Sequence, residues 1–238
     1  MSSEYIDVMD IEGYRRQLRN RRSAPMRLID VMGTADYKRS IKERRQARKN
    51  QNVVLDIDET CVHTSDSPEP SETSDKVRPR YYRFTLGSSV FWGVTRPHLD
   101  MFIRFCFDRF NNVIVWSAGQ YDYVHQMVKT IFVDRPPNLI LTREDCTSKG
   151  GLLTKPLSKV YSRVDGANET NTLIVDDRET VYSLDNPDNG INIPAYSPSP
   201  MELEMDDRAF LQLMRYMMLP EVVQSTDVRT LDKSKIFT

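Results

Sequence analysis

The chain has 238 residues, which is enough for one sizeable domain and a small addition. Hydrophobic residues make up 39% and charged residues 28% of it, as in a soluble globular protein. No apolar run approaches the roughly 20 residues that span a bilayer, and residues 1–10 are acidic, so we expect no secretory signal. The cysteines are odd in number and form no C-x-x-C motif, so we expect reduced thiols in an intracellular protein of the nucleus or cytoplasm.

The net charge of −1 is unevenly distributed along the chain. Residues 11–50 hold 13 Lys and Arg against 4 Asp and Glu, a net charge of +9, whereas residues 51–238 carry −7. A basic segment of this kind can contact nucleic acid or act as a nuclear import signal. It can equally form a solvated helix that packs on the acidic body. We treat residues 1–50 as a basic N-terminal extension, and both interpretations stay open.

Residues 51–220 alternate between apolar, strand-like segments and amphipathic, helix-like segments. In chain order, we expect strands at 53–55, 113–116, 139–142, 172–175 and 191–193, and helices at 96–110, 121–132 and 206–218. The apolar runs of the strands indicate burial on both faces, as in a parallel sheet. The pattern predicts a Rossmann-like α/β fold, a three-layer sandwich, with residues 221–238 as a C-terminal tail.

A β-hairpin is expected to interrupt this alternation. Residues 65–80 are rich in Pro and Ser and predict a loop. Residues 81–86 and 90–94 are rich in aromatic and β-branched residues and flank a turn at 87–89, which is the pattern of a hairpin. We therefore expect an insertion at about residues 81–95, whose aromatic side chains can belong to a core or line a substrate groove.

Two aspartates mark the end of the first strand, in the stretch VVLDIDET at 53–60. In a parallel α/β sheet, ligands bind at the C-terminal ends of the strands. Side chains two residues apart on an extended chain point the same way, so Asp56 and Asp58 are expected to lie together. One carboxylate could act as a nucleophile and the other as an acid/base, and a divalent cation such as Mg²⁺ would relieve their repulsion.

Later strand ends supply further candidates. Ser117 ends the second strand, Asp176 and Asp177 end the fourth, and a glycine turn presents Lys155. Phosphoryl transfer to a carboxylate needs a nucleophile, a proton donor, a metal, and cations or hydroxyls around the phosphate oxygens. Each residue alone has a purely structural interpretation, but their order along the chain favours a phosphatase site.

The stretch at 53–60 resembles the first motif of the haloacid dehalogenase-like phosphatases. With Glu59 in place of the commoner Gly, it is similar to the branch that dephosphorylates the C-terminal domain of RNA polymerase II. Three further stretches, RPHLDMF, WSAG and REDC, resemble motifs of the small phosphatases in that branch and stand at 96–102, 116–119 and 143–146. The resemblance covers roughly residues 50–220.

The resemblance implies a role for each candidate residue. Asp56 would attack phosphorus and form an aspartyl-phosphate, and Asp58 would protonate the leaving serine oxygen and then deprotonate water. Asp56, the backbone carbonyl of Asp58, and Asp177 would hold Mg²⁺. The remaining residues would bind phosphate oxygens or line the site: Ser117, where the family usually has Thr, Lys155 and Arg143 for the phosphate, and Tyr123 for the lining.

Two departures from the family pattern lie beside these residues. Pro156 stands where an Asp usually follows the lysine, and Asp177 stands where Asn is often found. Pro156 removes an acid and could reorient Lys155. Asp177 keeps a metal ligand and adds a negative charge, so Mg²⁺ could bind more tightly. Both changes leave the substrate open.

The sequence therefore predicts a Mg²⁺-dependent phosphatase in residues 51–220 that acts on a phosphoserine protein, such as the RNA polymerase II C-terminal repeat. Two alternatives stay open. A nucleic-acid 3′-phosphatase of the same superfamily would use the basic residues 11–50, and salt-dependent binding to DNA would favour it. A non-catalytic phosphopeptide-binding module would keep the pocket without turnover, and the intact pair of Asp56 and Asp58 argues against it.

Overall fold

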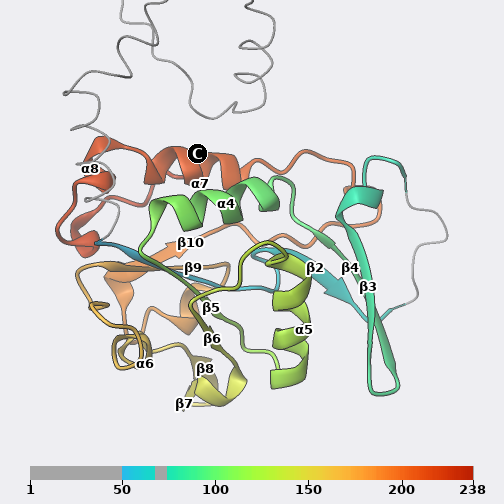
Figure 1. Cartoon of the computed structure of the whole chain (residues 1–238), viewed down its shortest axis with the longest axis horizontal. Coiled ribbons are helices and arrows are strands. Elements are labelled where there is room, and N and C mark those ends of the chain that lie inside the picture. Colours follow the sequence, from blue (N-terminus) through green and yellow to red (C-terminus); the bar gives the residue numbers. More distant parts are fainter. Residues whose placement is uncertain (1–49, 68–73, 238) are drawn as a thin grey trace, which may run out of the picture. The chain divides into compact units, whose positions relative to one another are not determined.

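A five-stranded parallel sheet forms the centre of the computed structural model, which describes residues 50–67 and 74–237 (Figure 1). Its strands run in the order β10-β9-β1-β5-β6. Their bounds are β1 (Asn52–Leu55), β5 (Asn112–Trp116), β6 (Leu139–Leu141), β9 (Thr172–Asp176) and β10 (Gly190–Asn192). The strands predicted from the sequence are confirmed, whereas the basic extension at residues 1–49 lies outside the described residues.

β1 lies in the middle of this sheet because its side chains are apolar on both faces. Val54 pairs in register with Ile114 of β5 and with Ile174 of β9, so these three side chains point to one face. They belong to one buried cluster. Val53 and Leu55 point to the other face and are also buried. A continuous apolar run is what a strand with two covered faces requires.

Helices cover both faces and confirm the three-layer α/β architecture. On one side lie α4 (Leu99–Arg109), α5 (Tyr121–Ile131) and α7 (Ala209–Met217). Figure 1 shows α4 and α7 side by side, and their Phe102 and Phe210 rings stack with centroids 4.2 Å apart. Phe107 of α4 meets Phe132, which follows α5. On the face to which Val54 points, α6 (Ser158–Tyr161) adds Val160 to the cluster.

Two of the helices begin three residues later than the sequence predicts. Arg96 is not helical, because its N–H donates to the Cys61 carbonyl at 2.9 Å and His98 adopts a left-handed φ of 66° before α4 starts. At α7, the Asp207 carboxylate accepts a hydrogen bond from the Ala209 N–H at 3.0 Å. A side chain that binds the first free N–H groups sets the start of a helix.

The inserted hairpin consists of β3 (Tyr81–Leu86) and β4 (Ser89–Thr95), which pair antiparallel as predicted. A strand that the sequence analysis missed, β2 (Val62–Ser65), pairs with β4 and completes a three-stranded sheet in the order β2-β4-β3. Its sequence VHTS has neither an apolar run nor a clean alternation, so periodicity gave no signal. Because only residues 59–61 separate Asp58 from β2, the insertion lies beside the end of β1.

The remaining elements complete the body. β7 (Thr147–Lys149) and β8 (Leu152–Thr154) form a short hairpin that leads into Lys155. α8 (Pro220–Val223) is tied to the residue just before β1, because the Gln51 side chain donates to the Val222 carbonyl at 2.9 Å. Within the described part of the chain, we find no helix with the length and apolarity needed to cross a membrane.

Candidate active site

Asp56 directly follows β1 and lies beside the end of β9. Its backbone N–H donates to the Val175 carbonyl at 3.0 Å, which extends the strand pairing by one step. Its carboxylate accepts a hydrogen bond from the Lys155 ammonium at 2.5 Å, and the same ammonium donates to Asp176 at 2.6 Å. All three side chains are buried. Two strand ends and one turn thus form a buried triad of two acids and one base.

The charges in this triad depend on one another. Burial raises the pKa of Asp56, the Lys155 ammonium opposes this rise, and the Asp176 and Asp58 carboxylates add to it. Burial alone would lower the pKa of Lys155, but the carboxylates of Asp176 and Asp56 raise it above its usual range. Lys155 therefore stays protonated and divides its charge between two acids. A cation at this position can also meet the oxygens of a phosphate.

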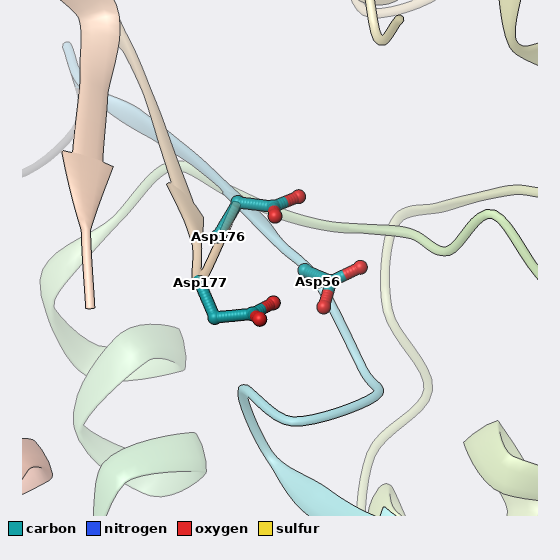
Figure 2. Close-up of side chains that lie close together, drawn as sticks. All are labelled: Asp56, Asp176 and Asp177. Carbon is teal, nitrogen blue, oxygen red and sulfur yellow. The ribbon is translucent and has the colours of Figure 1, made fainter. Parts of the chain in front are cut away.

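Three carboxylates form a candidate metal site. Asp56, Asp176 and Asp177 can each place one oxygen within 4.8 Å of the others. Figure 2 shows their side chains reaching into the same space from the end of β1 and the end of β9. Burial, with help from Asp176 and Glu59, raises the pKa of Asp177 to about 6, so the site disfavours uncompensated negative charge. Hard oxygen ligands of this kind fit Mg²⁺.

The cluster contains two of the expected metal ligands and one carboxylate that the sequence analysis had given no metal role. Asp56 and Asp177 were expected ligands, and Asp176 joins them. The expected contribution of Asp58 is its backbone carbonyl, which is not part of this group of side chains. The Asp58 carboxylate instead has partners on other elements.

Asp58 is held through both of its carboxylate oxygens. Ser117, at the end of β5, donates to Oδ2 at 3.2 Å, and the Tyr123 hydroxyl on α5 donates to Oδ1. Burial raises the pKa of Asp58, and these two hydrogen bonds oppose the rise. A carboxyl group with a raised pKa retains a proton closer to neutral pH, as a general acid must. Two predicted site residues therefore contact the candidate acid.

Arg143 lies next to this group without contacting it through its side chain. Its N–H donates to the Gly119 carbonyl at 2.9 Å, so its backbone adjoins the loop that begins at Ser117. The side chain is exposed. Among the described residues, no hydrogen bond joins its guanidinium to Ser117 or Lys155. Its role as a phosphate ligand stays a prediction.

Two residues that support the site were not singled out as site residues by the sequence analysis. The buried Thr60 hydroxyl accepts a hydrogen bond from the Asp177 N–H at 3.2 Å, which joins the loop after β1 to the end of β9. Asn186 accepts from the Leu157 N–H at 3.2 Å and donates to the Lys155 carbonyl at 3.1 Å, so it fixes the backbone around Pro156. Thr60 stood inside the first motif and could have been suspected. Asn186 offered no signal, because it is distant along the chain.

Comparison with known proteins identifies relatives. The model of the NLI interacting factor-like phosphatase family matches residues 51–229. The "Probable C-terminal domain small phosphatase" of Dictyostelium discoideum is 30% identical over 186 residues, which are 78% of this chain and 55% of that protein. Nuclear envelope morphology protein 1 of Saccharomyces cerevisiae is 24% identical over 195 residues, which are 77% of this chain and 42% of that protein.

Solved structures share the fold. A structure of the fission yeast RNA polymerase II CTD phosphatase Fcp1 bound to beryllium fluoride is similar with a TM-score of 0.52 and 18% identity, over 76% of this chain and 54% of that chain. A second structure of Fcp1 gives a TM-score of 0.52 at 16% identity, over 82% of this chain and 62% of that chain. At such identities the likeness concerns the fold alone.

The chain spans about half the length of the first curated relatives that it matches. The part that matches includes the whole parallel sheet, the inserted hairpin and every residue of the site described above. The resemblance that the sequence analysis drew from the motif at 53–60 is confirmed. The chain belongs to the NLI interacting factor-like phosphatase family.

Proposed function

We propose that this chain is a Mg²⁺-dependent phosphoprotein phosphatase that works through an aspartyl-phosphate on Asp56. One observation carries the proposal: a buried carboxylate at the end of the central strand touches a lysine, and a second carboxyl group with a raised pKa lies two residues further on. Burial raises the pKa of both groups, but the Lys155 ammonium favours the ionised form of the first, as a nucleophile needs, whereas Tyr123 and Ser117 hold the second in place as a proton donor.

The reaction would proceed in two displacements. Asp56 attacks phosphorus while the bond to the serine oxygen breaks, and Asp58 gives its proton to that oxygen. The ionised Asp58 then takes a proton from water, whose oxygen attacks phosphorus, releases phosphate and restores the Asp56 carboxylate. Mg²⁺ held by Asp56, Asp177 and the Asp58 carbonyl would neutralise charge on the phosphate. The other residues would bind phosphate oxygens: Ser117, Lys155 and Arg143.

We propose a phosphoserine protein as the substrate, such as the RNA polymerase II C-terminal repeat. One support is the relative that is named as a C-terminal domain small phosphatase. A second is the position of the hairpin: its Phe84 and Phe91 rings contact the ring of Tyr123, whose hydroxyl donates to Asp58. A nuclear location would fit this substrate, and three of the relatives are named for the nuclear envelope. A substrate with a long, acidic chain would also suit the basic residues 11–50.

The experiment that tests this proposal is turnover by the purified chain of phosphoserine peptides, phosphothreonine peptides, an aryl phosphate and 3′-phosphorylated oligonucleotides. We expect Asp56→Asn to lower the rate on every substrate by more than about 10³-fold, because an amide cannot form the acyl-phosphate. Asp58→Asn should cost about 10²–10⁴-fold. Asp108→Asn, on the exposed side of α4, serves as the control and should leave the rate unchanged.

Metal dependence is tested in the same assay. Chelation should abolish turnover and added Mg²⁺ should restore it, whereas full activity in excess EDTA would contradict the metal role. A preference for the oligonucleotide, with salt-dependent binding, would favour the 3′-phosphatase, for which the charge of +9 in residues 11–50 is the supporting observation. Binding of phosphopeptides without turnover would favour the non-catalytic module.

A further inference from the structure

A chain of hydroxyl groups connects the inserted hairpin to Asp58. The Tyr82 hydroxyl on β3 lies 2.6 Å from the Thr64 hydroxyl on β2. The Tyr123 hydroxyl lies within hydrogen-bond distance of both the Thr64 oxygen, at 2.9 Å, and the Asp58 carboxylate. It has a single proton, so when that proton is donated to Asp58, the Thr64 hydroxyl donates to Tyr123. Each hydroxyl carries one proton and two lone pairs, so all members can be satisfied together, with the last proton directed at the carboxylate.

A glycine makes this chain of contacts sterically feasible. Gly93 of β4 pairs with Thr64 on one side and with Tyr82 on the other, so the three residues form one row across the sheet. A Cβ atom at position 93 would collide with the Tyr82 hydroxyl and with the His63 carbonyl. Tyr82 therefore reaches over the bare backbone of β4 to meet Thr64 on the far strand. Any larger residue at position 93 would close this path.

The ring of Tyr123 is held by the same hairpin. Phe84 and Phe91 face each other across β3 and β4, and their rings stack at 5.4 Å. The Tyr123 ring lies 6.1 Å from the first and 6.2 Å from the second. Two aromatic contacts fix the ring, and Thr64 fixes its hydroxyl. The hairpin therefore fixes the position of the Tyr123 hydroxyl that donates to Asp58.

Orientation matters at Asp58 because its last torsion, from an sp³ to an sp² carbon, has broad energy minima. Ser117 binds one carboxylate oxygen and Tyr123 binds the other, and only the two bonds together fix the plane of the group. A proton donor must lie within hydrogen-bond reach of the leaving oxygen. Loss of the Tyr123 anchor would let the carboxyl group rotate away from that oxygen.

We propose that Tyr82, acting through Thr64 and Tyr123, positions the acid/base group of Asp58, so that the hairpin is part of the catalytic machinery as well as a wall of the site. This inference rests on the proposed phosphatase function. Tyr82 and Thr64 are positioning residues, since neither touches the reacting atoms. Tyr123, expected from the sequence only to line the site, donates a hydrogen bond to Asp58 and orients its carboxyl group.

The test compares two substrates that differ in their need for a proton donor. A phosphoserine peptide releases an alkoxide unless the leaving oxygen is protonated, whereas an activated aryl phosphate releases a stable phenolate. For the full chain with Mg²⁺, we expect Tyr82→Phe and Thr64→Val to lower kcat/KM for the peptide by about 10-fold, a small share of the effect of removing the acid. For the aryl phosphate, kcat/KM should change less than about 2-fold.

A double-mutant cycle and a control complete the design. If Tyr82 acts through Tyr123, adding Tyr82→Phe to Tyr123→Phe should cost no further activity on the peptide. Tyr161→Phe is the matched control, because its hydroxyl is buried and has no hydrogen-bond partner among the described residues. It should leave the ratio of the two kcat/KM values at the wild-type level.

The outcomes separate the two proposals. Equal losses on both substrates, or additive losses in the double variant, would overturn the positioning role while wild-type turnover leaves the phosphatase function standing. Unchanged kcat/KM in Tyr82→Phe would overturn it as well. If the wild-type chain turned over neither the peptide nor the aryl phosphate, the proposed phosphatase function and this inference would both be overturned. A selective, non-additive loss on the peptide supports the inference.

Discussion

Glu59, directly after Asp58, adopts a backbone conformation that non-glycine residues rarely take. Its φ is 59°, in the left-handed region. The conformation is held by two short backbone hydrogen bonds, one from the Glu59 N–H to the Val62 carbonyl at 2.7 Å and one from the Tyr196 N–H to the Glu59 carbonyl at 2.6 Å. This tight loop turns the chain back toward β2 and holds Asp58 in place. Glu59 also adds to the negative charge that raises the pKa of Asp177.

Substitution of this residue separates backbone strain from charge. Glu59→Ala and Glu59→Gly both remove the carboxylate, but only glycine relieves the left-handed strain, which costs about 1 kcal/mol. We expect Glu59→Gly to be the more stable of the two variants by up to about 1 kcal/mol, since the added freedom of glycine in the unfolded chain offsets part of the gain. Urea unfolding of the pair at one pH measures the difference. A Glu59→Gly variant that is no more stable than Glu59→Ala would contradict this prediction.

At the scale of elements, Arg96 joins three parts of the fold. Its buried guanidinium donates to both carboxylate oxygens of Asp207 at 2.8 and 2.9 Å, next to the start of α7. A third N–H donates to the Thr60 carbonyl at 3.2 Å. Thr60 in turn accepts the N–H of Asp177. The end of β4, the loop after β1 and the start of α7 are therefore linked, and the candidate metal site lies at the end of that linkage.

We predict that Asp207→Ala lowers the free energy of unfolding by about 2–3 kcal/mol, because it leaves a buried guanidinium without its carboxylate. The value lies below the roughly 3–5 kcal/mol typical of fully buried pairs, since the Asp207 side chain is 27% exposed. We also expect this variant to need more Mg²⁺ for half activity. Asp206→Ala is the control: Asp206 is 63% exposed and pairs with His98, so its loss should cost under about 1 kcal/mol. Equal destabilisation by both variants would refute the role given to Arg96.

The elements were predictable where a period or a composition shift marked them, and the site was predictable where motifs stood at strand ends. β1, β5 and β9 showed apolar runs, and the hairpin showed aromatic strands around a glycine turn. β2 showed neither, because its residues are half-buried on a strand whose partner could not be known. The contact of Lys155 with Asp56 spans 99 positions, so spacing could not give it. The row Thr64, Gly93 and Tyr82 depends on the register of two strand pairs, which periodicity leaves open.

At the scale of the whole molecule, the described residues contain every group proposed for the chemistry, and the charge of +9 lies before them in residues 11–50. We predict that removal of residues 1–45 leaves hydrolysis of a small aryl phosphate nearly unchanged. The same truncation should weaken turnover of a long, acidic phosphoprotein, because a basic segment raises the encounter rate and salt screens this effect.

Rates on both substrates at low and high salt, together with a melting curve, measure this prediction. The full chain at high salt should behave as the truncated chain does at low salt, which provides an internal control. If the truncated chain loses activity on both substrates alike and melts at a lower temperature, the extension stabilises the body and the recruitment interpretation is wrong.

The pairing of β1 with its neighbours has a consequence for how such a chain can change in length during evolution. Leu55 lies in register with Val115 and Val175, one residue before Asp56, Trp116 and Asp176. Losing or gaining one residue within β1 shifts one part of the strand relative to β5 and β9, so either buried side chains turn to the opposite face or Asp56 leaves the site. The turn at Gly87 bears no such packing constraint, because nothing lies within 4 Å of the position that a Cβ atom would take there. Insertions and deletions at the tip of the hairpin are therefore compatible with the reaction, whereas those in the central strands are not.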